Sequence, residues 1–395
     1  MSPSEVGALA RLRATNRRAV MRALTQHGPS SRADLARRTG LSPTTVSGIV
    51  RDLLADGVLS QQDERGRPHK GGSGRPPRLL TLSAQRGAVA GIDIGHRHVR
   101  VAVADHVGRI AHELERRVDS DERGPRTMDV ACELLDEALG AADAGALTAV
   151  GLSVPAPIDR RSARISTGIL PGWRGVVPVE DLAARVNVPV TADNDANLGA
   201  LAEVHHGAAR RSQHVVYLKL ASGVGAGLVI GRQVFRGATG HAGEIGHVRV
   251  QEHGTVCRCG SRGCLETEVS VPRLIELLQP AYDLPLDVDT VRALERDGDA
   301  GVRRVLEDAG ATVGRVVADL CNAVNPSLVV VGGPFGGSTA LHRGLQAALD
   351  RYAQPDIAHA VSIVPGELGT EAQVRGAIAL ALAGLIQQRD AAPIG

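Results

Sequence analysis

The sequence predicts an α/β protein with a body of two similar lobes and a ligand cleft between them, preceded by a small basic domain of helices. Strand-like and helix-like segments alternate from residue 89 onward, which is typical of α/β lobes. A pattern of strand, glycine turn and strand occurs at residues 89–105 and again at 215–235, which indicates a weak internal duplication. Residues 1–80 contain fourteen Arg or Lys and six Asp or Glu, a net charge of +8, although the complete chain carries only +2. A basic head on an acidic body indicates that the head meets a polyanion.

Length and composition indicate a multidomain globular protein. A chain of 395 residues suggests two or three domains, and 43% apolar residues are enough for sizeable cores. Aromatic residues make up only 2%, so the cores must be aliphatic. No run of about eighteen apolar residues occurs, and the start of the chain is polar and rich in Arg. We therefore expect a cytoplasmic protein without a membrane partner.

The basic head is predicted to contain three helices. The first spans residues 16–27, where apolar residues recur with helical spacing. Ser31 has the position of an N-cap for a second helix that stops at Gly40. Ser42, which is followed by a proline, has the same position for a third helix that ends at Gly57. Two short helices joined by a turn that contains glycine form a helix-turn-helix.

The polar side of the third helix is predicted to contact DNA. Its side chains are small and hydroxylic or cationic, which suits base edges and phosphates in the major groove. An alternative is a three-helix bundle that packs against something else, but the charge of +8 favours double-stranded DNA as the partner. The predicted DNA-binding residues of this helix and its cap are Ser42, Thr44, Thr45, Ser47 and Arg51.

Two strands at residues 58–60 and 78–82 are predicted to form a wing, which completes a winged helix-turn-helix domain over residues 1–82. The loop between the strands is basic. Its Gly-Arg-Pro-Pro segment resembles an AT-hook-like arm, in which an extended Arg75 enters the minor groove of DNA. A flexible basic linker that makes loose phosphate contacts is an equally good interpretation of the same loop.

One histidine and three cysteines lie within eighteen residues of the body. Thiolate and imidazole are the ligands that a tetrahedral zinc prefers, and four protein ligands close the site. Gly260 and Gly263 permit the tight turns that bring three sulfurs to one ion. A loop of free thiols is the alternative, but the spacing favours a single structural zinc. The predicted ligands are His247, Cys257, Cys259 and Cys264.

Two carboxylates flank this predicted metal site. Glu244 lies just before the ligand His247, and Glu266 follows the ligand Cys264. A rigid turn around a metal would hold both carboxylates toward one pocket, where they can accept hydrogen bonds from the hydroxyl groups of a ligand. The stretch therefore predicts a pocket for a polyhydroxylated ligand.

The order Glu-x-Gly-His followed by Cys-x-Cys-Gly-x-x-Gly-Cys-x-Glu, from Glu244 to Glu266, resembles the signature of the ROK family. This family contains sugar kinases and sugar-responsive repressors, and the resemblance covers essentially the whole chain. It implies a two-lobed actin-like ATPase fold of the ribonuclease H-like type for residues 83–395. It also implies that the two glutamates and His247 bind sugar hydroxyls, and that His247 ligates zinc as well.

Asn194 and Asp195 resemble a second sugar-binding segment of this family. In the kinases of the family the aspartate is the general base toward a sugar hydroxyl, whereas in a member without kinase activity it would only bind that hydroxyl. An aspartate in a first helical turn also favours the helix dipole, which is the structural alternative. Ile169 stands where the family often has asparagine, so one polar sugar contact is expected to be missing. The predicted sugar-binding residues are Asn194, Asp195, Glu244, His247 and Glu266.

The resemblance leaves two functions, repressor and kinase. ROK kinases usually have Asp-x-Gly-Gly-Thr at their first phosphate turn, because bare backbone and a small hydroxyl can approach phosphates closely. This chain has His96 and Arg97 in place of the second glycine and the threonine. With the DNA-binding head, this favours a sugar-responsive repressor of carbohydrate uptake or metabolism genes over the alternative, an ATP-dependent sugar kinase.

As a repressor, the protein is expected to have no enzymatic activity, and Asp195 is then a vestigial base. We expect it to bind one structural Zn²⁺, a sugar or sugar derivative and a double-stranded DNA operator. A homodimer or a homotetramer is expected, since helix-turn-helix proteins commonly read two half-sites.

Overall fold

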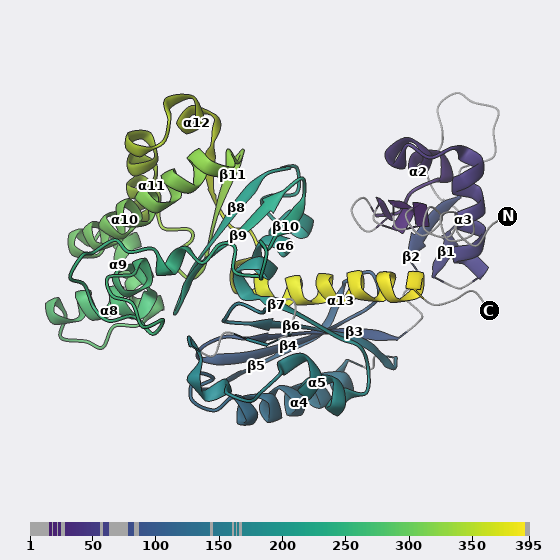
Figure 1. The fold of residues 1–395 in the computed structure, drawn as a ribbon, viewed down its shortest axis with the longest axis horizontal. Coiled ribbons are helices and arrows are strands. Elements are labelled where there is room, and N and C mark those ends of the chain that lie inside the picture. Colours follow the sequence, from purple (N-terminus) through teal and green to yellow (C-terminus); the bar gives the residue numbers. More distant parts are fainter. Residues whose placement is uncertain are drawn as a thin grey trace.

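The computed structural model has a small N-terminal domain at one end of a two-lobed body (Figure 1). None of the helices in the described part of the chain is long and apolar enough to span a lipid bilayer. The described residues are 16–17, 19–21, 23–24, 28–55, 58–62, 78–82, 87–142, 145–159, 162, 164–165 and 168–391.

The first helix of the helix-turn-helix, α2 (Arg32–Thr39), begins and ends as its sequence predicts. The hydroxyl of Ser31 accepts a hydrogen bond from the Asp34 amide, and the Asp34 carboxylate accepts one from the Ser31 amide. This capping box satisfies two donors that a helix start would leave unpaired. Gly40 ends the helix in the left-handed conformation, with φ 70°.

The second helix and the wing are also confirmed. α3 (Pro43–Ala55) starts where predicted, and the Ser42 hydroxyl accepts from the Thr45 amide as a cap. The strands β1 (Leu59–Gln62) and β2 (Leu79–Leu82) pair antiparallel. Gly57, the predicted end of the third helix, lies outside the described residues. The core of this domain is aliphatic, and its fully buried members include Val20, Leu35, Val46, Val50, Leu53 and Leu80.

The first lobe of the body is a five-stranded sheet with the order β5-β4-β3-β6-β7. β3, β4 and β5 pair antiparallel, whereas β6 and β7 continue the sheet in parallel on the other side of β3. α4 and α5 cover one face of this sheet and α13 covers the other (Figure 1). The bounds are β3 (Ala88–Ile94), β4 (His98–Ala104), β5 (Ile110–Arg117), α4 (Gly124–Ala141), β6 (Leu147–Val154), α5 (Pro178–Val186), β7 (Val190–Asn194) and α13 (Ala372–Ala391).

The second lobe repeats this topology with the order β10-β9-β8-β11-β12 and the same antiparallel and parallel pairs. The predicted internal duplication is therefore confirmed. α6 follows β7 directly and packs against β8 and β9, so it joins the two lobes. The bounds are α6 (Asp195–His206), β8 (Val215–Leu220), β9 (Val224–Ile230), β10 (Gln233–Phe235), α7 (Leu265–Val269), α8 (Val271–Leu278), α9 (Val288–Asp297), α10 (Ala300–Val324), β11 (Leu328–Gly332), α11 (Thr339–Tyr352), α12 (Pro355–Ala360) and β12 (Ser362–Pro365).

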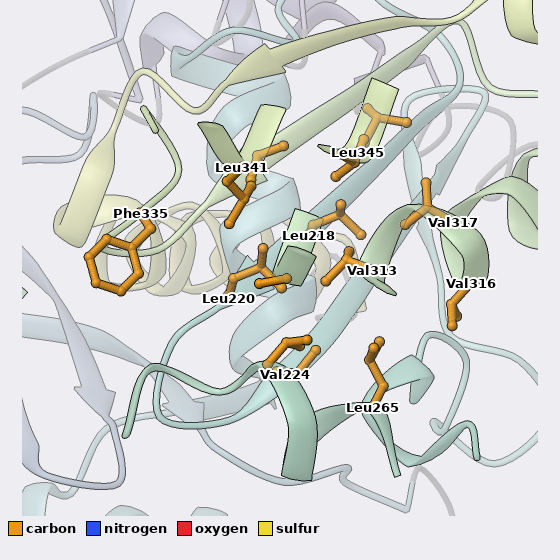
Figure 2. Packing of buried hydrophobic residues seen from close by; sticks show 14 of the residues in the cluster. Leu218, Leu220, Val224, Leu265, Val313, Val316, Val317, Phe335, Leu341 and Leu345 are labelled. Atoms are coloured by element: carbon orange, nitrogen blue, oxygen red, sulfur yellow. The ribbon is translucent and has the colours of Figure 1, made fainter. Parts of the chain in front are cut away.

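Successive side chains of β8 lie on opposite faces of the second sheet. Leu218 and Leu220 lie in the main core with side chains of α10 and α11, as Figure 2 shows. Tyr217 is fully buried in a second cluster together with residues of α6. Because successive side chains of a strand point to opposite faces, Lys219 lies on the Tyr217 face. The strand thus brings a cation to the start of α6, where the two lobes meet.

Glycines allow α13 to lie in close contact with both the first sheet and α6. A Cβ atom on Gly151 of β6 would lie 1.8 Å from the Ala377 carbonyl oxygen of α13. A Cβ atom on Gly376 of α13 would lie 2.0 Å from the Leu198 carbonyl oxygen of α6. Only glycine permits backbones to approach so closely. α13 therefore fixes the position of α6, and of the residues at its start, relative to the first sheet.

We expect Gly151→Ala to destabilise the body, because the new methyl group must push α13 away from the sheet. Overpacking of this kind costs about 1–3 kcal/mol. Gly140→Ala on α4 is the control, since nothing lies within 4 Å of that position and alanine favours helices over glycine. Chemical denaturation should give a lower midpoint for Gly151→Ala and an unchanged or higher one for Gly140→Ala. Equal midpoints for the two variants would contradict the packing described.

Candidate functional site

One pocket is lined by residues of both lobes. Ile169 contributes an apolar side chain to its wall. His96 and Lys219 line it as well, and neither was predicted as a ligand-binding residue. The pocket also brings together all the residues predicted to bind a sugar, namely Asn194, Asp195, Glu244, His247 and Glu266.

The start of α6 presents Asp195 to this pocket. Asn194 is the N-cap, and its side-chain oxygen accepts from the amides of Ala196 (2.9 Å) and Asn197 (3.3 Å). Asp195 lies in the first helical turn, as predicted, and is the first residue of the helix. Asn194 therefore has a structural task in the helix start, and Asp195 is held in place by that start.

Lys219 forms an ion pair with Asp195, with 2.5 Å between Nζ and Oδ2. Burial alone would lower the pKa of Lys219, but the nearby carboxylates of Asp195, Asp93 and Glu266 outweigh it and raise the pKa, so the ammonium is charged. The signal for this residue was present in the sequence as a single lysine in an otherwise apolar strand. Charged residues are rarely buried unless they are paired. A buried charged residue is therefore a candidate for a functional site.

The two glutamates beside the predicted metal loop, which is residues 247–264, lie in different surroundings. Glu266 is held by two donors, since Oε2 accepts from the Val224 amide (3.0 Å) and Oε1 pairs with Nε of Arg258 (3.3 Å). Glu244 is more weakly held, and burial together with the negative charges of Asp195 and Glu266 raises its pKa to about 7. Three carboxylates in one pocket suit a ligand that donates several hydrogen bonds.

The four predicted metal ligands form one cluster, with all ligand atoms within 4.8 Å of one another. Nδ1 of His247 is 3.6 Å from Sγ of Cys257, and the sulfurs of Cys259 and Cys264 are 3.8 Å apart. A tetrahedral zinc with Zn–S bonds of about 2.3 Å places its sulfur ligands about 3.8 Å from each other. The donor set and its spacing therefore fit a four-coordinate zinc.

The metal loop also links the cluster to the pocket. Gly260 and Gly263 adopt φ 87° and 63°, which confirms the predicted glycine turns. Nε2 of His247 is 3.7 Å from the Glu244 carboxylate, so the two ring nitrogens face the pocket and the sulfurs respectively. The ordering of the loop therefore decides where the pocket side chains lie.

Arg258, between two of the predicted cysteine ligands, reaches from the second lobe to the first. Its guanidinium pairs with Asp121 (3.1 Å) as well as with Glu266. His96 from the first lobe joins the same group through Nδ1, which lies 2.6 Å from Asp121. Burial would raise the pKa of Asp121, but the hydrogen bond and charge of His96 and the charge of Arg258 outweigh it and lower the pKa.

The turn after β3 differs from its predicted arrangement. We expected His96 and Arg97 to fill the space at this turn. His96 is buried there, but the Arg97 side chain is 70% exposed and pairs with Asp119 at the surface. His98 takes the place expected for Arg97: its ring would lie 2.2 Å from a Cβ atom on Gly95. The side chains after Gly95 alternate along β4, which turns position 98 inward and position 97 outward.

His98 and Ser153 also engage the buried carboxylate of Asp93. Nε2 of His98 is 3.1 Å from Oδ2, and the Ser153 hydroxyl donates to Oδ1 at 2.6 Å. Burial would raise the pKa of Asp93, but these hydrogen bonds, with the charges of His98 and Lys219, lower it. Both oxygens of the carboxylate at the first phosphate turn are therefore in use.

The predicted DNA-binding residues of α3 lie on one side of the helix. Thr44, Ser47 and Arg51 are exposed, and the Arg51 side chain is 81% exposed. Ser42 and Thr45 bond to each other through their hydroxyls (2.8 Å) at the cap. The α3 face thus offers small polar groups and one long cation to a partner. Arg75 of the predicted minor-groove arm lies outside the described residues.

Comparisons with known proteins match two separate parts of the chain. Residues 89–383 match the model of the ROK family, and residues 13–60 match a winged helix-turn-helix DNA-binding model. The xylose repressor of Bacillus subtilis is 27% identical over 365 residues, which cover 91% of this chain and 93% of that protein.

Two solved structures resemble different extents of the chain. A ROK family transcriptional regulator, described as a homologue of the E. coli MLC protein, superposes with a TM-score of 0.79 at 21% identity, over 96% of this chain and 99% of its own. A ROK family glucokinase from Streptomyces griseus, in complex with glucose and AMPPNP, superposes with a TM-score of 0.67 at 26% identity. That alignment covers 75% of this chain and the complete glucokinase.

Proposed function

The chain belongs to the ROK family, and because a winged helix-turn-helix domain precedes its family body, we propose that it is a sugar-responsive DNA-binding transcriptional repressor. The observation that carries this proposal is the presence of both parts in one chain. The similarity to the Bacillus subtilis xylose repressor spans 91% of the chain, whereas the glucokinase matches 75% of it. The sugar is the signal, and an operator sequence is the target of α3.

The pocket between the lobes is proposed as the sugar site. Glu244, Glu266 and Asp195 would accept hydrogen bonds from sugar hydroxyls, and His247 would contribute its pocket-facing ring nitrogen. The support is that these side chains line one pocket, come from both lobes and include the weakly held Glu244. A ligand that contacts both lobes binds better to one relative arrangement of the lobes, which is the requirement for a signal.

We expect Glu244→Ala to weaken the sugar response and to leave operator binding in the sugar-free state intact. Loss of a hydrogen-bonding carboxylate from such a pocket costs about 1–3 kcal/mol, or about 5- to 150-fold in affinity. Glu252→Ala is the matched control, since Glu252 is an exposed glutamate of the same loop. The measurement is the sugar concentration that alters binding to an operator selected from random DNA. A Glu244→Ala protein that responds as the wild type does would place the sugar elsewhere.

One zinc is proposed to have a structural role. His247 and the three cysteines would hold it, and it would order the loop that carries Glu244, Arg258 and Glu266. Four protein ligands would occupy all coordination positions of a tetrahedral zinc, so none would remain for a substrate.

We further propose that the protein is not a sugar kinase. Phosphoryl transfer requires close positioning of a triphosphate and magnesium. His98 and Ser153 engage the Asp93 carboxylate at the phosphate turn, so neither of its oxygens is left without a partner. A receptor that does not phosphorylate its sugar also leaves the concentration of the signal unchanged.

An ATP-coupled assay across hexoses, pentoses and amino sugars is therefore expected to give no turnover. Calorimetry with ATP alone should give no heat of binding, because His98 fills the turn. The Streptomyces griseus glucokinase is the positive control for the assay. Turnover near the enzyme median of about 10 per second would instead make the protein a kinase with a DNA-binding head.

A further inference from the structure

We propose that the pocket takes an uncharged, hydroxyl-rich sugar rather than a sugar phosphate, and that Lys219 and Asp195 together bind one of its hydroxyl groups. This inference rests on the proposed function of the pocket and names its ligand class. It assigns Lys219 as a specificity-determining residue of the sugar site.

Lys219 lies in the pocket wall with a side chain that is only 12% exposed. Lys70 and Lys219 are the only lysines among the 45 cationic Lys and Arg residues of the chain. The composition thus strongly favours arginine, yet this pocket contains the compact ammonium group. A guanidinium is a planar fork that binds phosphate and carboxylate in a bidentate manner, whereas an ammonium is a point charge with three donors that rotate. The residue type suits a single hydroxyl oxygen.

The hydrogen bonds of Lys219 leave donors for a ligand. Within the described residues, Asp195 is the only partner to which its ammonium donates. An ammonium has three N–H donors, so two remain in the pocket wall. A sugar hydroxyl beside the pair can accept from Lys219 and donate to Asp195 or Glu244 at the same time. Such a bridge requires a group that both donates and accepts a hydrogen bond, as a hydroxyl does. An ionised phosphate oxygen can only accept.

The charge balance of the pocket opposes an anion. The carboxylates of Asp195, Glu244 and Glu266 line it, and Lys219 is the one Lys or Arg among its lining residues in the part of the chain described. Asp195 already neutralises this lysine at 2.5 Å. The guanidinium of Arg258 is likewise paired, with Glu266 and Asp121. A phosphate group would meet carboxylates without an unpaired lysine or arginine, and like charges at close range repel. An uncharged ligand avoids this repulsion.

The two lysines permit a direct test in the complete wild-type protein. Labelling with [ζ-¹⁵N]lysine gives two side-chain signals, which Lys70→Arg assigns by removing one of them. Titration with D-xylose, D-glucose, N-acetyl-D-glucosamine and cellobiose is expected to shift the Lys219 signal and to leave the Lys70 signal in place. Calorimetry should show that glucose 6-phosphate or N-acetylglucosamine 6-phosphate binds at least tenfold more weakly than its parent sugar.

Lys219→Met provides the second measurement. The affinity for the sugar that binds the wild type should fall at least tenfold, and the zinc content and melting temperature report whether the variant is folded. If the variant does not fold, the Lys219 signal of the wild-type protein still shows whether a sugar contacts this residue. A bound uncharged sugar that leaves this signal unmoved would overturn the role of Lys219, and tighter binding of a phosphate ester would overturn the ligand class. In both cases the repressor function stands, whereas binding of none of these compounds would count against the sugar site and this inference together.

Discussion

Cys259→Ser is expected to release the zinc and to disorder the loop between His247 and Glu266. The apparent binding free energy of a structural zinc site is about 10–16 kcal/mol, and for a loop without a core of its own this energy is folding energy. Three ligands cannot close a tetrahedral site, so most of this stabilisation is lost. Elemental analysis should find close to one zinc per chain in the wild type, purified without added metal, and almost none in the variant.

The same substitution should also remove the sugar response. Glu266 follows the ligand Cys264 by two residues and accepts from the Val224 amide only when the loop is ordered. Cys132→Ser is the control, because Cys132 is a half-buried thiol in α4 and is not part of the ligand cluster. That variant should keep both its zinc and its sugar response. A wild-type protein that is free of metal, folded and able to bind sugar would refute the structural role of zinc.

Removal of residues 1–82 is expected to abolish operator binding and to leave zinc and sugar binding in the remaining body. We propose that the boundary between the two domains lies there. Residues 1–80 have a net charge of +8, so the rest of the chain has a net charge of −6 and repels the DNA backbone. Fluorescence anisotropy with a labelled operator measures the loss, and calorimetry measures the sugar affinity of the body. Operator binding by the body alone would reject the assignment of α3.

A point variant tests the same surface in the complete protein. Arg51 is exposed on α3, and Arg51→Ala should weaken operator binding and reduce the salt slope of log K by about 1 if it contacts a phosphate. As a homodimer, the protein would read a pseudo-palindromic operator with half-sites about 10 base pairs apart or a multiple of this. Selection of operators from random DNA measures that spacing.

Local chemistry made much of this protein predictable from its sequence. The ends of α2 could be predicted at Ser31 and Gly40, because a capping box and a left-handed glycine depend only on a few neighbouring residues. His247 and the three cysteines form a cluster because eighteen residues with two glycine turns leave few other arrangements. The repeated strand pattern predicted two similar lobes, since the side-chain period of a strand is visible in any sequence.

Only the tertiary structure decided which charged groups meet in the pocket. Lys219 and Asp195 lie on different elements, and they pair because β8 packs against α6. Arg258 of the predicted metal loop reaches Asp121 of the other lobe, 137 residues earlier in the chain. His98, and not Arg97, fills the phosphate turn because of the register of β4. Some of these contacts join residues that are distant in the sequence, and others depend on the register of a strand. The packing of the cores and the close glycine contacts elsewhere in the fold determine which of these residues meet.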